Sequence, residues 1–177
     1  MIDRSTNTPP LKETLKELAA EADRYYLKSS SIVETLHYRG RTFYSKFRRI
    51  DSSPNATLLS QHLNKEITLA LPLLQEGKGD KLIIEYLGDE PERFLQTLIR
   101  LFAHLGFQQY RIFQGKYKDR RIVILPLPKQ TLNELHDLGS RLSDMLETRL
   151  SKSWRILPDR RLPEDYNIYT LPYGYIN

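Results

Sequence analysis

The chain has 177 residues, of which 40% are apolar, and this predicts one globular domain with a core of ordinary size. It contains no cysteine, which excludes disulfides, thiolate metal sites and cysteine nucleophiles. Neither a signal peptide nor an apolar run long enough to span a bilayer is found, so we expect a cytoplasmic protein with no membrane partner. The net charge of +5 makes a polyanionic partner worth testing.

The first half of the chain is predicted to hold two helices around a strand pair. Leucines at helical spacing predict a helix that ends near Tyr25. Two extended segments then meet at Gly40, because β-branched and aromatic residues are dense on both sides of this turn residue. Ser53 and Pro54 predict the start of a second helix, as a capping hydroxyl followed by proline.

The second half shows clearer periodicity. After a strand at 66–71 and a turn at 77–80, we expect strands at 81–87, 109–113, 120–125 and 154–158 and helices at 88–106 and 131–150. Asp89 is the expected cap of the first of these helices, and Gly106 its end. The order β-α-β-β-α-β predicts an α+β fold with a ferredoxin-like core, in which an antiparallel sheet carries both helices on one face.

We therefore predict a single composite domain over residues 1–177. Its expected parts are a frayed start (1–8), an N-terminal helix, strand pair and helix that pack on the core (9–75), the ferredoxin-like core (81–157) and an extended tail (158–177). The other face of the core sheet would otherwise be bare, so we expect the first 75 residues to cover it at least in part.

One basic stretch stands out, HYRGRTFYSKFRR at 37–49, which combines cations with aromatics and contains no carboxylate. Arginine suits phosphate because its planar fork makes paired hydrogen bonds, and aromatic rings stack on bases. A second basic concentration lies at 111–121. The predicted phosphate-binding residues are Arg39, Arg41, Lys46, Arg48, Arg49, Arg120 and Arg121, and the predicted stacking residues are Tyr38 and Tyr44.

Strand alternation limits this prediction, because it divides the cations between two faces of the second strand. Phe43 and Phe47 share a face and are expected to belong to the core. Arg39 and Arg41 flank the turn at Gly40, where two guanidinium groups and backbone donors can meet one anion. We expect Arg39→Ala with Arg41→Ala to preserve the fold and remove most polyanion affinity. The alternative is a solvated basic surface.

Catalytic and metal-binding patterns are sparse. Glu85, Asp89 and Glu90 could together bind one magnesium ion, but their spacing departs from that of a two-metal site. Solvation or pairing of Glu85 and helix capping by the two loop acids explain them better. None of the four histidines has ligand spacing. We expect no catalytic residue, no metal site and no cofactor, with magnesium only as a companion of a bound nucleotide.

Several stretches, HYRGRTFYSKF (37–47), PERF (91–94), TLNE with LG (131–139), WRILP (154–158) and YNIYTLPY (166–173), carry a resemblance to known sequences. Through them, residues 25–173 resemble a family of uncharacterised proteins of epsilon-class proteobacteria, known as a domain of unknown function. The resemblance implies a cytoplasmic bacterial protein, without an activity or a substrate.

Three functions remain open. The first is a non-catalytic nucleotide- or nucleic-acid-binding protein that uses the arginine-rich surface. The second is a protein-interaction or self-association module, because tyrosine and arginine also carry the binding energy of protein interfaces. The third is an enzyme acting on a phosphorylated small molecule, with the same arginines stabilising the transition state.

Overall fold

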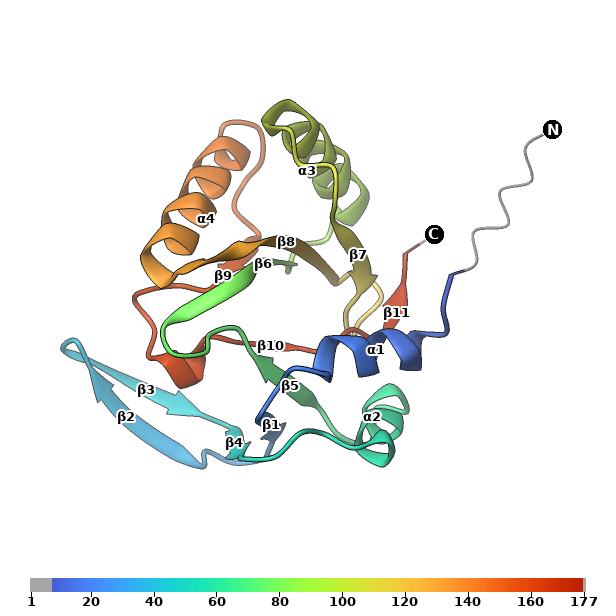
Figure 1. Ribbon diagram of the computed structural model, residues 1–177. Helices are drawn as coiled ribbons and strands as arrows, with labels where there is room; N and C mark the ends of the chain where they lie inside the picture. Colours follow the sequence, from blue (N-terminus) through green and yellow to red (C-terminus); the bar gives the residue numbers. More distant parts are fainter. Residues whose placement is uncertain (1–7, 177) are drawn as a thin grey trace.

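The computed structural model describes residues 8–176 as helices and antiparallel strands in separate sheets, which confirms the predicted α+β class. Of the segment predicted to be frayed, only Thr8 lies among the described residues. Figure 1 shows helices α3 (Pro91–Leu105) and α4 (Leu132–Glu147) above a central sheet, and a second sheet with helices α1 (Leu11–Ala19) and α2 (Ala56–Leu63) below it. Within residues 8–176, no helix has both the length and the apolar character that a membrane span requires.

The central sheet contains five strands in the order β11-β7-β8-β6-β9. Two helices connect its strands, so that the chain runs β6-α3-β7-β8-α4-β9, and all strand pairs are antiparallel, as the β-α-β-β-α-β prediction required. The bounds are β6 Lys78–Tyr86, α3 Pro91–Leu105, β7 Arg111–Gln114, β8 Arg121–Thr131, α4 Leu132–Glu147, β9 Trp154–Leu157 and β11 Gly174–Tyr175.

Helices α3 and α4 cover one face of this sheet (Figure 1) because their apolar stripes bury leucine and phenylalanine side chains against β6 and β8. Gly106 ends α3 in the left-handed conformation, with φ of 82°, as predicted. The predicted Asp89 cap is wrong, since Glu90 occupies the cap position without a side-chain bond. The hydroxyl of Tyr86 instead accepts a hydrogen bond from the Glu90 backbone N–H at 2.8 Å.

The opposite face of the central sheet packs on the N-terminal part of the chain. Ile83, Ile122 and Ile124 from the central sheet share a core with Leu15, Leu59 and Leu69 from the N-terminal part. This lower layer is a four-stranded sheet in the order β10-β5-β1-β4 with two helices. The bounds are α1 Leu11–Ala19, β1 Tyr25–Lys28, β4 Phe47–Ile50, α2 Ala56–Leu63, β5 Leu69–Pro72 and β10 Ile168–Thr170.

The tail after β9 is mainly extended, apart from the short 3-10 helix η1 at Glu164–Tyr166. It adds one strand to each sheet, because β10 pairs with β5 and β11 pairs with β7. The C-terminal residues therefore connect the two layers.

Two predicted helix boundaries in the N-terminal part are wrong. Helix α1 ends at Ala19, well before Tyr25, because the side chain of Tyr25 belongs to the sheet core and its backbone pairs with Ile50 of β4. The cap of α2 is Asn55, whose side chain accepts from the backbone N–H of Leu58 at 2.9 Å. Ser53 lies outside the helix, and its hydroxyl donates to the carbonyl of Ala22.

The predicted turn at 77–80 also lies two residues too far along the chain. The chain reverses at Glu76 and Gly77, which have φ of 53° and 74°, and Gln75 and Lys78 face each other across the turn. Strand β6 therefore begins at Lys78 and includes Gly79, where the pairing register shifts. A Cβ atom at Gly79 would lie 2.6 Å from the carbonyl oxygen of Leu73, so only glycine fits this approach.

Candidate nucleic-acid interface

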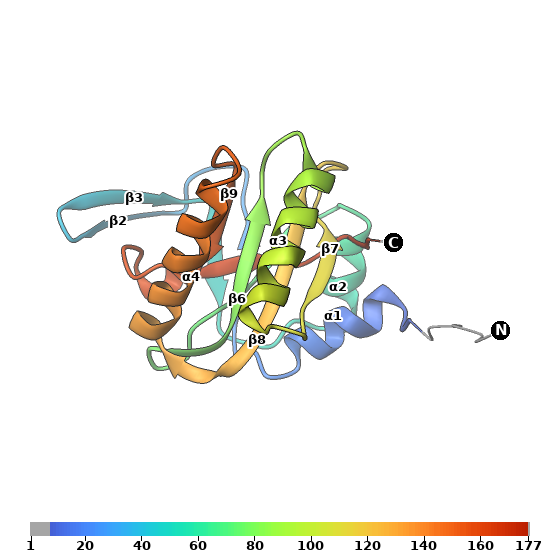
Figure 2. The ribbon, with the colours of Figure 1, turned by 90° about the horizontal axis from the view of Figure 1, so that it is seen from above.

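A hairpin carries most of the predicted site. Strand β2 (Glu34–Tyr38) pairs with β3 (Arg41–Ser45) in a two-stranded sheet of its own. Arg39 and Gly40 form the turn with φ of 49° and 74°, the left-handed pair that matches the twist of a two-residue hairpin. Figure 2 shows this hairpin projecting from one side of the molecule as an arm.

The two faces of the arm differ. Leu36, Tyr38 and Phe43 lie on the inward face and are half-buried, and Phe43 contacts the ring of Tyr166 with a centroid separation of 5.7 Å. The guanidinium of Arg39 lies over the ring of Tyr38 at 5.3 Å, as that of Arg41 does over Phe43 at 5.8 Å. The predicted stacking residue Tyr38 therefore already has a cation on its ring.

The outward face is open to solvent. Tyr44 is 64% exposed, so one face of its ring is available to a planar ligand. Next to it on this face, the side chains of His37 and Thr42 are 2.9 Å apart and form a hydrogen bond across the strand pair. Tyr44 is therefore better placed than Tyr38 for stacking.

A groove of 280 Å³ lies at the base of the arm. Three cations from separate segments line it: Lys28 at the end of β1, Lys46 between β3 and β4, and Arg155 on β9. The other lining residues are Tyr44, Ser45, Phe47, Asp165, Tyr166, Ile168 and Thr170. Among the described residues, no ion pair involves Lys28 or Lys46, so both ammonium groups can neutralise a bound anion.

Tyr166 lines the groove and carries an unpaired hydrogen-bond donor. Its hydroxyl is buried and has no hydrogen-bond partner in the part of the chain that the structure describes. Burial raises the pKa of this hydroxyl, and the negative charges of Glu34 and Asp165 raise it further, so it stays protonated near neutral pH. A buried hydroxyl without a partner costs free energy, and a ligand oxygen in the groove would recover it.

Two acids near the groove, Asp165 and Glu85, already have cationic partners. Asp165 accepts from Arg49 Nη1 at 2.8 Å and from the Tyr26 hydroxyl at 2.7 Å. Glu85 is only 8% exposed and accepts from Arg155 Nε and Nη2, at 3.0 and 2.5 Å. Among the predicted phosphate ligands, Arg49 therefore serves mainly to hold Asp165, along with Asp51 at 2.7 Å.

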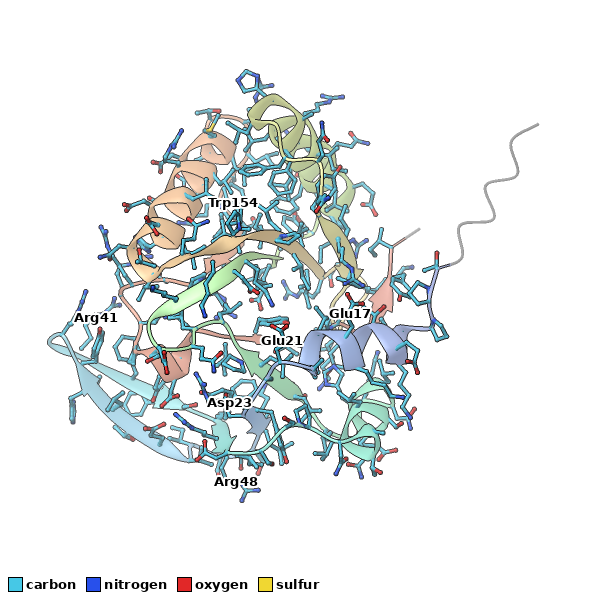
Figure 3. All side chains as sticks on the ribbon, viewed as in Figure 1. Glu17, Glu21, Asp23, Arg41, Arg48 and Trp154 are labelled. Atoms are coloured by element: carbon cyan, nitrogen blue, oxygen red, sulfur yellow. The ribbon has the colours of Figure 1, made fainter. Side chains whose placement is uncertain are left out.

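The remaining predicted arginines lie apart from the groove. Figure 3 shows Arg41 near the end of the arm and Arg48 pointing away from the lower surface. Arg120 and Arg121 are next to the β7–β8 connection, which Figures 1 and 2 place on the other side of the molecule from the arm. Arg120 donates to the carbonyl of Leu87, and the buried Arg121 donates to Lys118 O at 2.7 Å.

Arg121 also lies 3.5 Å from Glu92, which supplies a counter-charge. Both arginines thus have local partners that order the β7–β8 connection. The structure brings together Tyr44 and Lys46 from the predicted set and keeps Arg39 and Arg41 further along the arm.

Three groove residues were missed by the sequence reasoning. Lys28 lies nine residues before the basic stretch at 37–49, while Arg155 and Tyr166 are more than a hundred residues after it. Both belong to stretches that carry the family resemblance, WRILP and YNIYTLPY, and this is the one signal that pointed to them. Within residues 8–176, His, Asp and Glu side chains form no group of three that could hold a metal ion.

The comparisons with known proteins leave the function open. Residues 12–81 match a domain of unknown function, DUF1882. This part runs from α1 to the start of β6 and includes Lys28, the arm and Lys46. The expected resemblance to an uncharacterised domain is thus confirmed for this part, and an origin in epsilon-class proteobacteria stays a prediction. No curated protein matches the chain.

One solved structure that this chain is distantly similar to is the polymerase domain from Mycobacterium tuberculosis ligase D in complex with DNA. The sequence identity is 15% and the TM-score 0.47, over 78% of this chain and 60% of that one. This chain therefore spans less than two thirds of the polymerase domain. A likeness at this level says nothing about ligand or reaction.

Proposed function

We propose that this protein is a non-catalytic nucleic-acid-binding protein that holds a single strand along the arm and in the groove at its base. The observation that carries the proposal is the meeting of Lys28, Lys46 and Arg155 in one groove, which Tyr166 with its unpartnered hydroxyl also lines. Cations and a hydroxyl donor contact phosphate, and the exposed ring of Tyr44 beside them offers a stacking surface for a base.

The spacing of the cations favours a strand over a free nucleotide. Arg41 and Lys46 are five residues apart in extended chain, which corresponds to about 17 Å at roughly 3.4 Å per residue. One nucleotide can fill the groove but cannot also reach Arg39 and Arg41. A longer single strand can lie in the groove and also reach Arg39 and Arg41 at the end of the arm, whose guanidinium groups lie over the inward rings of Tyr38 and Phe43.

Binding should weaken steeply with salt. For single strands, log K falls with log salt at a slope of about −0.7 per neutralised phosphate. Arg155 is already paired with Glu85, so the four cations without an ion pair among the described residues (Lys28, Arg39, Arg41 and Lys46) give a slope of up to about −2.8. The measurement is the fluorescence anisotropy of a labelled short single-stranded oligonucleotide with the full chain, between about 50 and 200 mM salt.

Charge-matched variants separate a specific groove from general attraction. Lys28→Gln with Lys46→Gln should reduce the slope by about 1.4, as expected for two lost phosphate contacts. Lys65→Gln with Lys118→Gln changes the net charge equally, on exposed residues outside the groove and the arm. If this control pair weakens binding as much as the groove pair does, the cations act only through net charge, and the proposed site is refuted.

Two further variants test how the strand lies. Tyr44→Ala removes a largely exposed ring, so it should preserve the fold and cost about 1–3 kcal/mol of binding free energy per stacked base. Arg39→Ala with Arg41→Ala should weaken oligonucleotide binding and leave the binding of a mononucleotide unchanged. Equal affinity of this variant and the native protein for the oligonucleotide would contradict the path along the arm.

Self-association is a second candidate, favoured by exposed apolar residues on the same arm. Ile32 is 52% exposed and Val33 44% exposed, next to Tyr44 at 64%. Such a group on a projecting hairpin is typical of an interface. Light scattering decides between the two functions. Self-association is favoured if the native protein has the mass of a dimer with and without oligonucleotide, and if the double variant Val33→Ser with Tyr44→Ser has the mass of a monomer.

A further inference from the structure

A second pocket, of 180 Å³, lies where the two layers of the molecule meet, and we call it the seam pocket. Five segments form it: the chain after α1, the end of β5, the start of β6, the end of β8 and Tyr169 of β10. Its volume is below the roughly 300 Å³ at which sites for drug-sized molecules begin. It therefore suits a small ligand and is separate from the groove.

Tyr169 contributes a hydroxyl that lacks a partner. This residue is 1% exposed, and its hydroxyl makes no hydrogen bond to any described residue. Burial raises the pKa of the hydroxyl, so it remains a neutral donor. Buried polar groups in folded proteins are rarely left unpaired, and an exception calls for a water, ion or ligand.

Arg24 contributes a buried positive charge at the same pocket. It is 6% exposed and donates from Nε to Tyr26 Oη at 3.1 Å, from Nη1 to Asp23 at 3.1 Å and from Nη2 to Leu74 O at 2.8 Å. A guanidinium has five N–H donors, so two remain for a ligand. Its position is fixed from three sides, which is the preorganisation that an ion site needs.

The charges that line the seam pocket favour an anion. Of its three acids, Asp23 is paired with Arg24 and Asp80 with Lys81, which leaves Glu21. Figure 3 shows Glu21 and Asp23 close to the end of α1. Lys78 and Lys129 also line the pocket and have no ion pair among the described residues. The paired charges cancel, so the cations exceed the acids by one.

We propose that the seam pocket is a binding site for a small anion, phosphate or carboxylate, held by Arg24, Lys78, Lys129 and the hydroxyl of Tyr169. The hydroxyl and the guanidinium donate to the anion oxygens, and the two ammonium groups neutralise its charge. The site does not depend on the proposed nucleic-acid groove, because the two pockets share no lining residue.

The test is an NMR titration of the ¹⁵N-labelled full chain with inorganic phosphate at constant ionic strength, with acetate in a second arm. We expect saturable shifts of the backbone amides of Gly79 and Leu74, and the tighter of the two anions shows which chemistry the pocket prefers. Shifts that rise linearly without saturation for both anions would overturn the proposal.

Variants assign the shifts to the pocket. Tyr169→Phe removes only the unpartnered hydroxyl and should raise the Kd for the preferred anion about tenfold, the usual effect of losing a hydrogen bond to a charged group. Lys78→Gln with Lys129→Gln should raise it at least as much. Lys28→Gln with Lys46→Gln, the matched change in the groove, should leave the Kd unchanged.

An unchanged Kd in Tyr169→Phe and in the Lys78 and Lys129 variant would refute the site. Oligonucleotide binding is measured separately on the same proteins. The two proposals can therefore fail separately. Oligonucleotide binding without saturable anion binding would refute the seam pocket alone, and anion binding without oligonucleotide binding would refute the groove alone.

Discussion

The hydroxyl of Tyr26 provides a sharp test of the hydrogen-bond network between the two pockets. Tyr26 is 2% exposed, accepts from Arg24 Nε at 3.1 Å and donates to Asp165 at 2.7 Å. Tyr26→Phe keeps the ring and removes both bonds. Hydrogen bonds to charged groups contribute about 1.5–3 kcal/mol each to stability.

The two bonds should differ in cost. Without the Tyr26 hydroxyl, Arg24 would retain a buried N–H that has no acceptor. The loss of the bond between Arg24 and Tyr26 therefore lies at the upper end of the range of about 1.5–3 kcal/mol. Asp165 keeps its bond to Arg49 and is partly exposed, so water can replace the lost donor. We expect Tyr26→Phe to lower the free energy of unfolding by about 2–4 kcal/mol.

Tyr169→Phe is the matched control, because it deletes the same atom from an equally buried ring whose hydroxyl has no partner. Without ligand, its free energy of unfolding should stay within about 0.5 kcal/mol of the native value or rise, since burial of an unpaired hydroxyl is unfavourable. Urea unfolding in a buffer without phosphate or carboxylate measures both variants. Equal losses in the two variants, or no loss in Tyr26→Phe, would refute the reasoning.

The pH dependence of the same pair follows from the pKa of Tyr26. Burial, and then the hydrogen bond to Asp165, raise this pKa from 10.0 to about 12. The folded state thus binds the proton more tightly than the unfolded state, and this stabilisation is present below pH 10.0 and is lost as the pH rises toward 12. The stability difference between the native protein and Tyr26→Phe should therefore shrink over that window. A constant difference would contradict the raised pKa.

Two further predictions concern the core. Burial lowers the pKa of His62, whose Nδ1 accepts a hydrogen bond from the Leu69 N–H at 3.0 Å. The stability that the neutral His62 ring contributes is therefore present above pH 6.5 and is lost as the pH falls. NMR should show a neutral ring at pH 6.5, and a charged ring there would refute this prediction. Gly79→Ala places a Cβ 2.6 Å from Leu73 O and should cost about 1–3 kcal/mol in urea unfolding, and an unchanged midpoint would show that the bulge can relax.

Much of the fold follows from local patterns in the sequence. The leucine and phenylalanine stripes of α3 and α4 repeat at the helical period, and the β-α-β-β-α-β order could be predicted from them and from the strands between. The Arg39 and Gly40 turn follows from the glycine between two aromatic-rich strands. Helix boundaries were less predictable. Asn55, not Ser53, caps α2 by accepting a hydrogen bond from the Leu58 N–H, and both residue types are common caps, so the sequence does not distinguish them.

The candidate site depended on tertiary structure. The sequence by itself determined that cations and aromatics are dense in residues 37–49, and that the chain is α+β. Tertiary packing decided that Lys28 and Lys46 meet Arg155 and Tyr166, that Asp165 of the tail neutralises Arg49, and that Arg120 and Arg121 lie elsewhere. The reason is physical: periodicity reports interactions within a few residues, whereas charge pairing and pocket formation join segments far apart in the chain.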